Sequence, residues 1–117
     1  MSDKAYYITT PIYYVNDVPH IGNAYTTIMA DIASRYHRLK GEDTYFLTGT
    51  DENATKVAAA ATEKGVPVAE YVDRLAEDFK QVWASLDIKY DDFIRTTEPR
   101  HTKVVEAIFT KLRDAGD

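Results

Sequence analysis

The residues best suited to chemistry lie in the stretch from position 11 to position 27, PIYYVNDVPHIGNAYTT. It places His20 and Gly22 at the turn between a strand-like segment and a helix-like segment. Free N–H groups at a helix start bind anions such as phosphate, and a glycine there lets a flat base lie against the backbone. His20 can donate a hydrogen bond to a phosphate, and Asn23 can add a neutral donor. This spacing indicates a nucleotide site, although an exposed loop histidine is the more common origin of such a pair.

Asp51 is the second candidate, because it lies just past a predicted buried strand at 43–48. Ligands of α/β folds bind beyond the carboxyl ends of parallel strands, which places Asp51 at the same edge of the sheet as His20. A carboxylate in this position also commonly caps the following helix, which is predicted here from Ala54 onward. Both roles stay open on these residues alone.

The elements that must position these side chains alternate between strand and helix patterns. Short segments rich in aromatic and β-branched residues predict strands at 5–10, 43–48 and 91–96. Apolar residues at helical spacing predict helices at 23–40, 54–64, 68–86 and from 97 onward. Strands separated by helices of this length favour right-handed crossovers and a parallel sheet. We therefore expect an α/β fold, a parallel sheet with flanking helices, in a single domain over residues 1–117.

Two of the predicted helices carry apolar stripes that are expected to pack against the rest of the fold. The stripe of the helix at 68–86 consists of Val68, Val72, Leu75, Phe79, Val82, Trp83 and Leu86. The last helix is expected to start at Thr97 and to bury Val104, Val105, Ile108, Phe109 and Leu112. His37 and His101 are expected to face solvent. The cluster of Asp87, Asp91 and Asp92 is expected to form a solvated turn, because its spacing is not that of a cation-binding loop.

Composition excludes several kinds of site from these 117 residues. The formal net charge is -5 and no run of lysine or arginine appears, so the sequence shows no extended surface for nucleic acid. There are no cysteines, so neither a disulfide nor a thiolate zinc site can form within the sequence. No segment has the pattern of a membrane span, and residues 1–4 lack the apolar core of a secretory signal. We expect a cytoplasmic protein with no membrane partner and no metal site of its own.

The segment PIYYVND, together with PHIGNAYTT and DTYFLTGTDEN, closely resembles the first signature of the methionyl-tRNA synthetase family. These class I enzymes have a Rossmann-like catalytic domain and a motif of the His-Ile-Gly-His type. The similarity extends from about Tyr6 to Asp117, essentially the whole chain. It implies ATP-dependent activation of methionine, with Mg²⁺, to methionyl-adenylate, followed by transfer of methionine to tRNA(Met).

The resemblance also implies roles for individual residues. Catalysis is assigned to His20 and Asn23, and ATP binding to His20, Ile21, Gly22 and Asn23. Methionine binding is assigned to Ile12, Tyr14 and Asp51, and the carboxylate of Asp51 is expected to pair with the α-ammonium group of methionine. Asn23 and Asn53 stand where histidine is common in the family. Asparagine can donate a hydrogen bond but carries no positive charge.

By the same resemblance, residues 1–117 are expected to be only the first half of the class I synthetase nucleotide-binding domain. The zinc-bearing insertion, the second half with its Lys-Met-Ser-Lys-Ser loop and the anticodon-binding helices would lie downstream. Zinc and tRNA(Met) are therefore expected to bind outside this chain. The isolated chain is expected to be inactive or nearly so, and to associate through an unpaired sheet edge.

Two other functions remain open on the sequence. Small nucleotidyltransferases carry a His-x-Gly-His motif between a strand and a helix and use ATP without tRNA, although they lack the PIYYVND and Gly-Thr-Asp-Glu stretches. The non-enzymatic alternative is a fragment or paralogue that only docks onto a partner chain.

Overall fold

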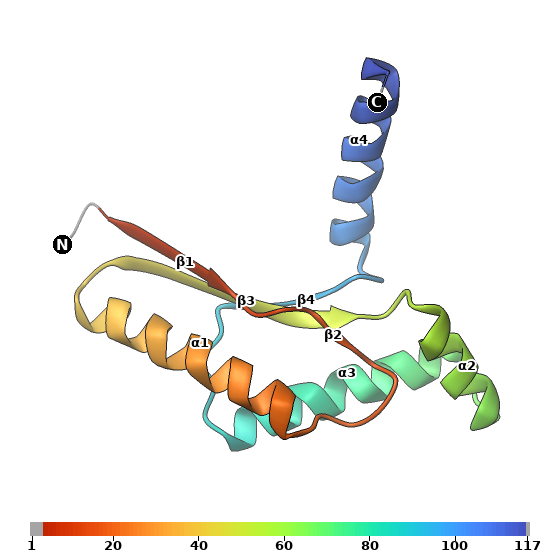
Figure 1. The fold of residues 1–117 in the computed structure, drawn as a ribbon, viewed down its shortest axis with the longest axis horizontal. Coiled ribbons are helices and arrows are strands. Elements are labelled where there is room, and N and C mark those ends of the chain that lie inside the picture. Colours follow the sequence, from red (N-terminus) through yellow and green to blue (C-terminus); the bar gives the residue numbers. More distant parts are fainter. Residues whose placement is uncertain (1–3, 117) are drawn as a thin grey trace.

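The computed structural model describes residues 4–116. Residues 1–3 and 117 lie outside the described residues, so the prediction for the opening segment 1–4 falls mostly outside them. Strands and helices alternate along the described chain (Figure 1). The strands are β1 (Ala5–Thr9), β2 (Tyr13–Tyr14), β3 (Asp43–Asp51) and β4 (Asp92–Arg95). The helices are α1 (Ile21–Leu39), α2 (Thr55–Glu63), α3 (Val68–Ser85) and α4 (Pro99–Ala115). The predicted order is confirmed with one addition, because the two-residue strand β2 lies in a segment expected to be a loop.

The sheet is parallel throughout and is built around β3. β1 pairs with the first half of β3, and β2 pairs with its end on the same side. β4 pairs with β3 on the other side, where Gly49 lies opposite Ile94. The expected α/β fold is confirmed. The carboxyl ends of β2, β3 and β4 meet at one edge, which is the edge where α/β folds bind ligands.

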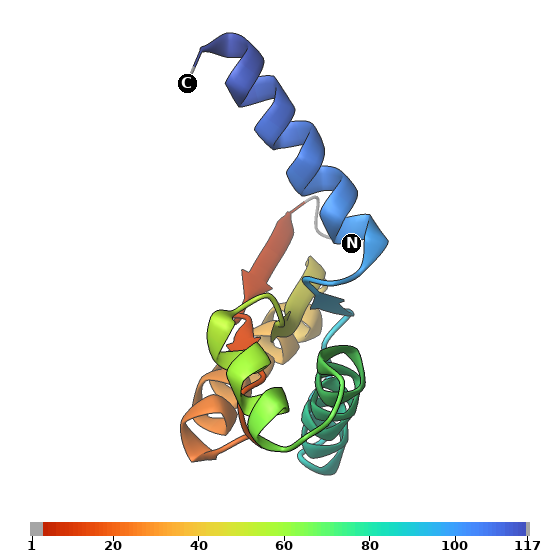
Figure 2. The ribbon, with the colours of Figure 1, turned by 90° about the vertical axis from the view of Figure 1, so that its right-hand side faces the viewer.

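Helices α1, α2 and α3 lie on one side of the sheet, whereas α4 leaves it on the other side and projects away (Figure 1, Figure 2). Trp83 is fully buried, as expected, and packs against Tyr13 and Phe79. The same core contains Val15, Ala30, Phe46, Val57, Ala61, Tyr71, Val72, Leu75, Ile88 and Phe93. Val68 and Leu86, at the ends of the predicted stripe, are exposed because they lie beyond this core. Within residues 4–116, none of the helices has the length and apolar character needed to cross a bilayer.

α1 packs on the sheet through small and polar residues instead of its larger apolar ones. Its buried residues are Thr27, Ala30, Asp31 and Ser34, whereas Ile28, Met29, Ile32, Tyr36 and Leu39 are exposed. The carboxylate of Asp31 accepts hydrogen bonds from the Lys89 backbone N–H at 2.8 Å and from Arg35 Nε at 2.6 Å. The apolar periodicity therefore locates this helix but not the face that packs, which is set by Asp31 and by close approach of small side chains.

All three aspartates predicted to form a solvated turn take part in ion pairs, but only one of them lies exposed at a turn. Asp87 is this residue, with a φ of 55°, and its exposed carboxylate pairs with Lys89 Nζ at 2.6 Å. Asp91 binds Arg38 Nη2 at 2.6 Å, and Asp92 binds the two terminal nitrogens of Arg100 at 2.6 and 2.9 Å. The turn prediction is right for Asp87 alone, since Asp91 and Asp92 join α1 and α4 to the start of β4.

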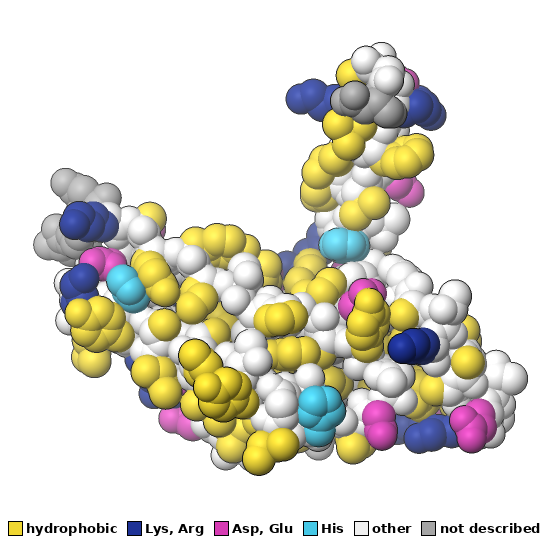
Figure 3. All heavy atoms as spheres, in the orientation of Figure 1, with side chains coloured by type: hydrophobic (Ala, Val, Ile, Leu, Met, Phe, Trp, Pro, Cys, Tyr) yellow, Lys and Arg dark blue, Asp and Glu magenta, His cyan; other side chains and the backbone are white. Residues whose placement is uncertain are grey.

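α4 departs most strongly from prediction. Its first residue is Pro99 and its N-cap is Glu98, so Thr97 does not start the helix. None of the described residues of α4 is buried, and the residues expected to be buried are 49–66% exposed, namely Val104, Val105, Ile108, Phe109 and Leu112. Hydrophobic side chains run along the projecting helix (Figure 3). Periodicity identifies the apolar face of a helix, but it does not show whether another part of the protein packs on that face. Within residues 4–116 nothing covers the apolar face of α4.

Both histidines expected to face solvent are only partly exposed, and His37 packs against neighbouring side chains. The ring of His37 stacks on Tyr6 with ring centroids 3.4 Å apart, and its Nδ1 pairs with the carboxylate of Glu42. Glu42 also binds Lys40 Nζ at 2.8 Å. These contacts, with Lys40 as the larger cause and His37 as the second, lower the pKa of Glu42 from 4.5 to about 2.

Glu42→Gln is expected to destabilise the fold above pH 4.5 and to have little effect near pH 2. Folding lowers the pKa of Glu42, so the ionised carboxylate stabilises the native state at pH values above 4.5, its pKa in the unfolded chain. This contribution is lost as the pH falls through about 2, its pKa in the folded chain. Urea midpoints of the two proteins should therefore converge on acidification. Glu106→Gln, on α4, is the control. A difference between Glu42→Gln and the original chain that stays constant with pH would contradict this assignment.

Gly49 lies where β3 and β4 approach too closely for a side chain. A Cβ at this position would lie 2.0 Å from the carbonyl oxygen of Ile94 and 2.7 Å from its Cγ2. Gly49→Ala is expected to force the strands apart and to lower the free energy of unfolding by about 1–3 kcal/mol or more, as overpacked sites do. Urea unfolding followed by the fluorescence of Trp83, the single tryptophan, measures this change.

Gly65→Ala is the matched control for Gly49→Ala. A Cβ at Gly65 meets nothing within 4 Å, so only the φ of +68° opposes the substitution. The expected cost at Gly65 is about 1–2 kcal/mol from backbone strain, with no change in strand pairing. A loss at Gly49 no larger than that at Gly65 would show that the close approach of Ile94 is not limiting.

Candidate active site

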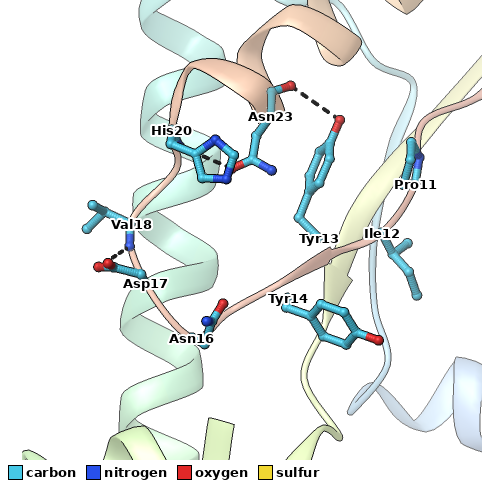
Figure 4. A pocket seen from close by; sticks show the side chains of 9 residues that line it. All are labelled: Pro11, Ile12, Tyr13, Tyr14, Asn16, Asp17, Val18, His20 and Asn23. Atoms are coloured by element: carbon cyan, nitrogen blue, oxygen red, sulfur yellow. Dashed lines mark hydrogen bonds between the residues drawn. The ribbon is translucent and has the colours of Figure 1, made fainter. Parts of the chain in front are cut away.

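The first turn of α1 is closed by reciprocal hydrogen bonds between its cap residue and its third residue. His20 is the N-cap, and its Nδ1 accepts from the Gly22 N–H at 3.0 Å. Asn23 Oδ1 accepts in return from the His20 N–H at 3.1 Å (Figure 4). The helix therefore begins at Ile21, two residues earlier than the predicted start at Asn23. This capping box holds His20 and Asn23 together at the end of the helix.

The His20 ring has a defined orientation. Because Nδ1 accepts a hydrogen bond, the neutral ring carries its proton on Nε2, where it is available for donation to a ligand. A Cβ on Gly22 would lie 2.9 Å from Cε1 of this ring and 3.1 Å from Nδ1. A side chain at residue 22 would therefore displace the imidazole from this position, in addition to filling the space for a base that the sequence suggests.

β2 supports this turn with Tyr13. The ring of Tyr13 is buried, and its hydroxyl lies 3.0 Å from Thr27 Oγ1 and donates to the Asn23 carbonyl oxygen at 3.3 Å. Side chains alternate along a strand, so Ile12 and Tyr14 project from the opposite side of this segment, as Figure 4 shows. Ile12 and Tyr14 are 39% and 59% exposed. One side of this short segment thus supports α1, and the other is available for a ligand.

An open cavity of about 460 Å³ lies along the segment between β1 and α1 (Figure 4). It brings together four predicted site residues, namely Ile12, Tyr14, His20 and Asn23. The other lining residues are Pro11, Tyr13, Asn16, Asp17 and Val18. Ile21, Gly22 and Asp51 do not line it, and the side chain of Ile21 is turned to solvent. Contacts of Ile21 and Gly22 with ATP stay predictions, and they would use the backbone.

Asp51 is the last residue of β3 and lies opposite Tyr14 of β2. Paired residues of parallel strands direct their side chains to the same face, so Asp51 shares a face of the sheet with Tyr14. Its carboxylate accepts from the Asn53 N–H at 3.4 Å and does not cap α2, whose N-cap is Ala54 without a side-chain bond. The interpretation of Asp51 as a helix cap is therefore wrong, and the residue remains partly exposed.

Glu52 is a candidate that the sequence patterns do not reveal. Its side chain is fully buried, and its carboxylate accepts from Arg95 at 2.7–3.1 Å, from Thr50 Oγ1 at 2.7 Å and from Thr97 Oγ1 at 3.1 Å. Arg95 also binds Asp73 at 2.6 Å, and its bonds to Glu52, followed by those to Asp73, raise its pKa above the ordinary value. The sequence offers one indication of this pair, which is that Glu52 and Arg95 lie at the carboxyl ends of neighbouring parallel strands.

The cavity does not contain a metal site of its own. Among residues 4–116, no group of three or more histidine, cysteine, aspartate or glutamate side chains is placed to hold a metal ion. Asp17 is the one carboxylate that lines the cavity, and it accepts from the Val18 N–H at 2.8 Å. Mg²⁺ requires near-octahedral oxygen coordination, which a single carboxylate does not provide. These side chains therefore do not fit Mg²⁺ unless other ligands, such as phosphate oxygens, complete its shell.

Comparison with known proteins identifies the relatives of this chain. The family model described as tRNA synthetases class I (M) matches residues 6–117. The methionine-tRNA ligase of Fusobacterium nucleatum is 51% identical over 114 residues, which is 97% of this chain and 18% of that protein. The methionine-tRNA ligase of Thermotoga maritima is 54% identical over 112 residues, which is 96% of this chain and 18% of that protein. This chain therefore spans about a fifth of the length of these relatives.

A solved structure agrees with the fold. The Mycobacterium tuberculosis methionyl-tRNA synthetase in complex with methionyl-adenylate matches 97% of this chain with a TM-score of 0.95 and 43% identity, and this chain covers 22% of it. Similarity of this extent favours the synthetases over the small nucleotidyltransferases considered above. The parallel sheet with its flanking helices matches part of the Rossmann-like domain of the synthetase. Because the family match and the fold both cover nearly all of it, the chain belongs to the tRNA synthetases class I (M).

Proposed function

We propose that residues 1–117 form the first half of the catalytic domain of a methionine-tRNA ligase, where they bind ATP and methionine for the formation of methionyl-adenylate. One observation carries this proposal. The capping box of α1 engages Nδ1 of His20 and so leaves its Nε2–H as an oriented donor. His20 lines a cavity that Ile12 and Tyr14 also line. The similarity to methionine-tRNA ligases, and to a synthetase solved with methionyl-adenylate, supports the choice of substrates.

In the proposed reaction a carboxylate oxygen of methionine attacks the α-phosphorus of ATP. The new bond joins that oxygen to phosphorus, and the bond from phosphorus to the bridging oxygen breaks, so that pyrophosphate leaves with the electron pair. Negative charge grows on the phosphate oxygens, and donors that are already in position stabilise it. The Nε2–H of His20 and the N-terminal N–H groups of α1 are the donors. The first turn of α1, all of it described, contains no acidic side chain that would repel phosphate.

Asn23 is proposed to serve both the helix and the nucleotide. Its Oδ1 is occupied by the N–H of His20, which leaves the two hydrogens of Nδ2 as donors to a phosphate oxygen. Ile21 and Gly22 would contribute through the backbone, because their side chains offer no polar group. Mg²⁺ is assigned no protein ligand in this segment, and its proposed contribution is to neutralise phosphate charge when it is bound with ATP.

Methionine is proposed to bind on the face shared by Ile12, Tyr14 and Asp51. The exposed apolar surface of Ile12 and Tyr14 suits a thioether side chain. The partly exposed carboxylate of Asp51, beside Tyr14 in the sheet, would pair with the α-ammonium group. Binding of the ammonium group at the end of β3 would direct the methionine carboxylate toward the nucleotide, which is the orientation that the displacement requires.

The isolated chain is proposed to bind ATP weakly and to have little activity. Ile12, Tyr14 and His20 are all exposed, so water enters the site and weakens the electrostatic stabilisation of the transition state. In a complete ligase the remaining chain would close this site. Zinc and tRNA(Met) would be bound by that remaining chain, and the charging of tRNA would place the protein in the cytoplasm.

His20 can be tested in a chimeric ligase, made by replacing the matched segment of the Thermotoga maritima protein with residues 1–117. His20→Ala is expected to lower the rate of methionine-dependent pyrophosphate exchange on the order of 10²-fold, as the loss of a transition-state donor does. His101→Ala, on α4 and outside the cavity lining, is the control and should leave the rate unchanged. An unchanged rate for a folded His20→Ala chimera would remove His20 from the mechanism.

Asp51→Asn is expected to raise the KM for methionine about 10- to 100-fold in the chimeric ligase, the range for loss of a hydrogen bond to a charged group. The KM for ATP should not change, because Asp51 does not line the cavity beside His20. Asp43→Asn, at the opposite end of β3, is the matched control. Equal effects of the two substitutions, or an effect on ATP alone, would show that Asp51 does not bind the ammonium group.

A further inference from the structure

We infer that Glu52, through its buried ion pair with Arg95, is the positioning residue that holds the carboxylate of Asp51 toward the amino-acid site. This inference rests on the proposed function, because it takes Asp51 as the group that receives the ammonium of methionine. Glu52 itself is buried and does not line the cavity, so it would act through its neighbour and would not touch the substrate.

Glu52 is fixed at both its backbone and its carboxylate. Its N–H donates to Thr96 Oγ1 at 2.8 Å. Its Oε1 accepts from Arg95 Nη2 at 2.7 Å and from Thr97 Oγ1 at 3.1 Å, and its Oε2 accepts from Thr50 Oγ1 at 2.7 Å and from Arg95 Nε at 2.8 Å. A fully buried carboxylate with both oxygens bonded cannot rotate without leaving charge unpaired.

Asp51 lies between residues that this network holds in place. Thr50 precedes it and Glu52 follows it, and these two residues are bonded to each other. Asn53, whose N–H reaches the Asp51 carboxylate at 3.4 Å, donates from Nδ2 to the Thr96 carbonyl oxygen at 3.3 Å. The backbone of Asp51 is therefore fixed from both directions. In the described structure its carboxylate accepts only the long bond from Asn53, which leaves it available for a ligand.

Packing alone does not explain an ion pair at this position. Apolar residues of similar volume often replace a buried ion pair without loss of stability, so a purely structural contact would not need charge. The pair instead specifies one geometry at the end of β3, since each bond has a required direction. Arg95 also neutralises Glu52, so that Asp51 is the carboxylate left to attract an ammonium group at this end of β3.

The test uses Glu52→Gln in the chimeric ligase, which keeps the shape of the side chain and removes its charge. The KM for methionine is expected to rise on the order of 10-fold, with the KM for ATP unchanged, because misplacement of a binding group weakens only its own contact. Inhibition by the methionine analogue that lacks the α-amino group should not change, since this analogue makes no contact with Asp51. Asp92→Asn, which breaks the Arg100 pair at the other end of β4, is the matched control.

A double variant covers the case in which Glu52→Gln does not fold. Glu52→Gln with Arg95→Met removes both charges, so no buried charge is left unpaired, and it should give the same rise in the KM for methionine. Added to Asp51→Asn, Glu52→Gln is expected to cause no further rise. An unchanged KM for methionine in a folded Glu52 variant, or an equal loss of affinity for the amine-free analogue, would overturn the inference. No effect of Asp51→Asn itself would instead overturn the proposed amino-acid site, and this inference with it.

Discussion

The proposed nucleotide half of the site depends on the hydrogen bond from the Gly22 N–H to Nδ1 of His20, at 3.0 Å. That bond fixes three things together, namely the start of α1, the proton on Nε2 and the orientation of the ring beside the cavity. It also explains the glycine, since a Cβ at residue 22 would lie 2.9 Å from the ring. The proposed donor is thus part of the helix cap, and the cap restricts its position.

The proposed amino-acid half of the site, around Asp51, is held in a different way. Near Asp51 the carboxylate of Glu52 is buried, and its partners come from β3, β4 and the start of the connection to α4. His20, by contrast, is exposed and is held by residues next to it in sequence. Local opening at the end of β4 would therefore disturb methionine binding before it disturbs the cap of α1. The two proposed substrate sites would therefore be held by different kinds of contact, although both lie at the carboxyl edge of one sheet.

Sequence patterns predict the features that depend on nearby residues. The strand and helix order, the buried position of Trp83 and the grouping of His20 with Asn23 follow from local periodicity and from the rule for parallel strands. Features that depend on distant partners are not predictable in this way. The packed face of α1 is set by a bond from Lys89, 58 residues from Asp31, and the ion pair of Glu52 joins residues 43 positions apart. β2 has only two residues, too few for any pattern, and the apolar face of α4 carries no information about what covers it.

Asn23 shows what is gained and lost when a neutral amide stands where the family resemblance leads one to expect histidine. Its oxygen accepts the N–H of His20 at 3.1 Å while its nitrogen remains a donor, so one planar group serves the cap and a ligand at the same time. A neutral imidazole could also accept and donate, but protonation would remove its acceptor and open the cap. Asparagine keeps its own half of the cap, the bond from the His20 N–H, at every pH and gives up positive charge. In the proposed site, phosphate at this turn would therefore be stabilised by neutral donors, namely His20 Nε2–H, Asn23 Nδ2 and the N-terminal N–H groups of α1.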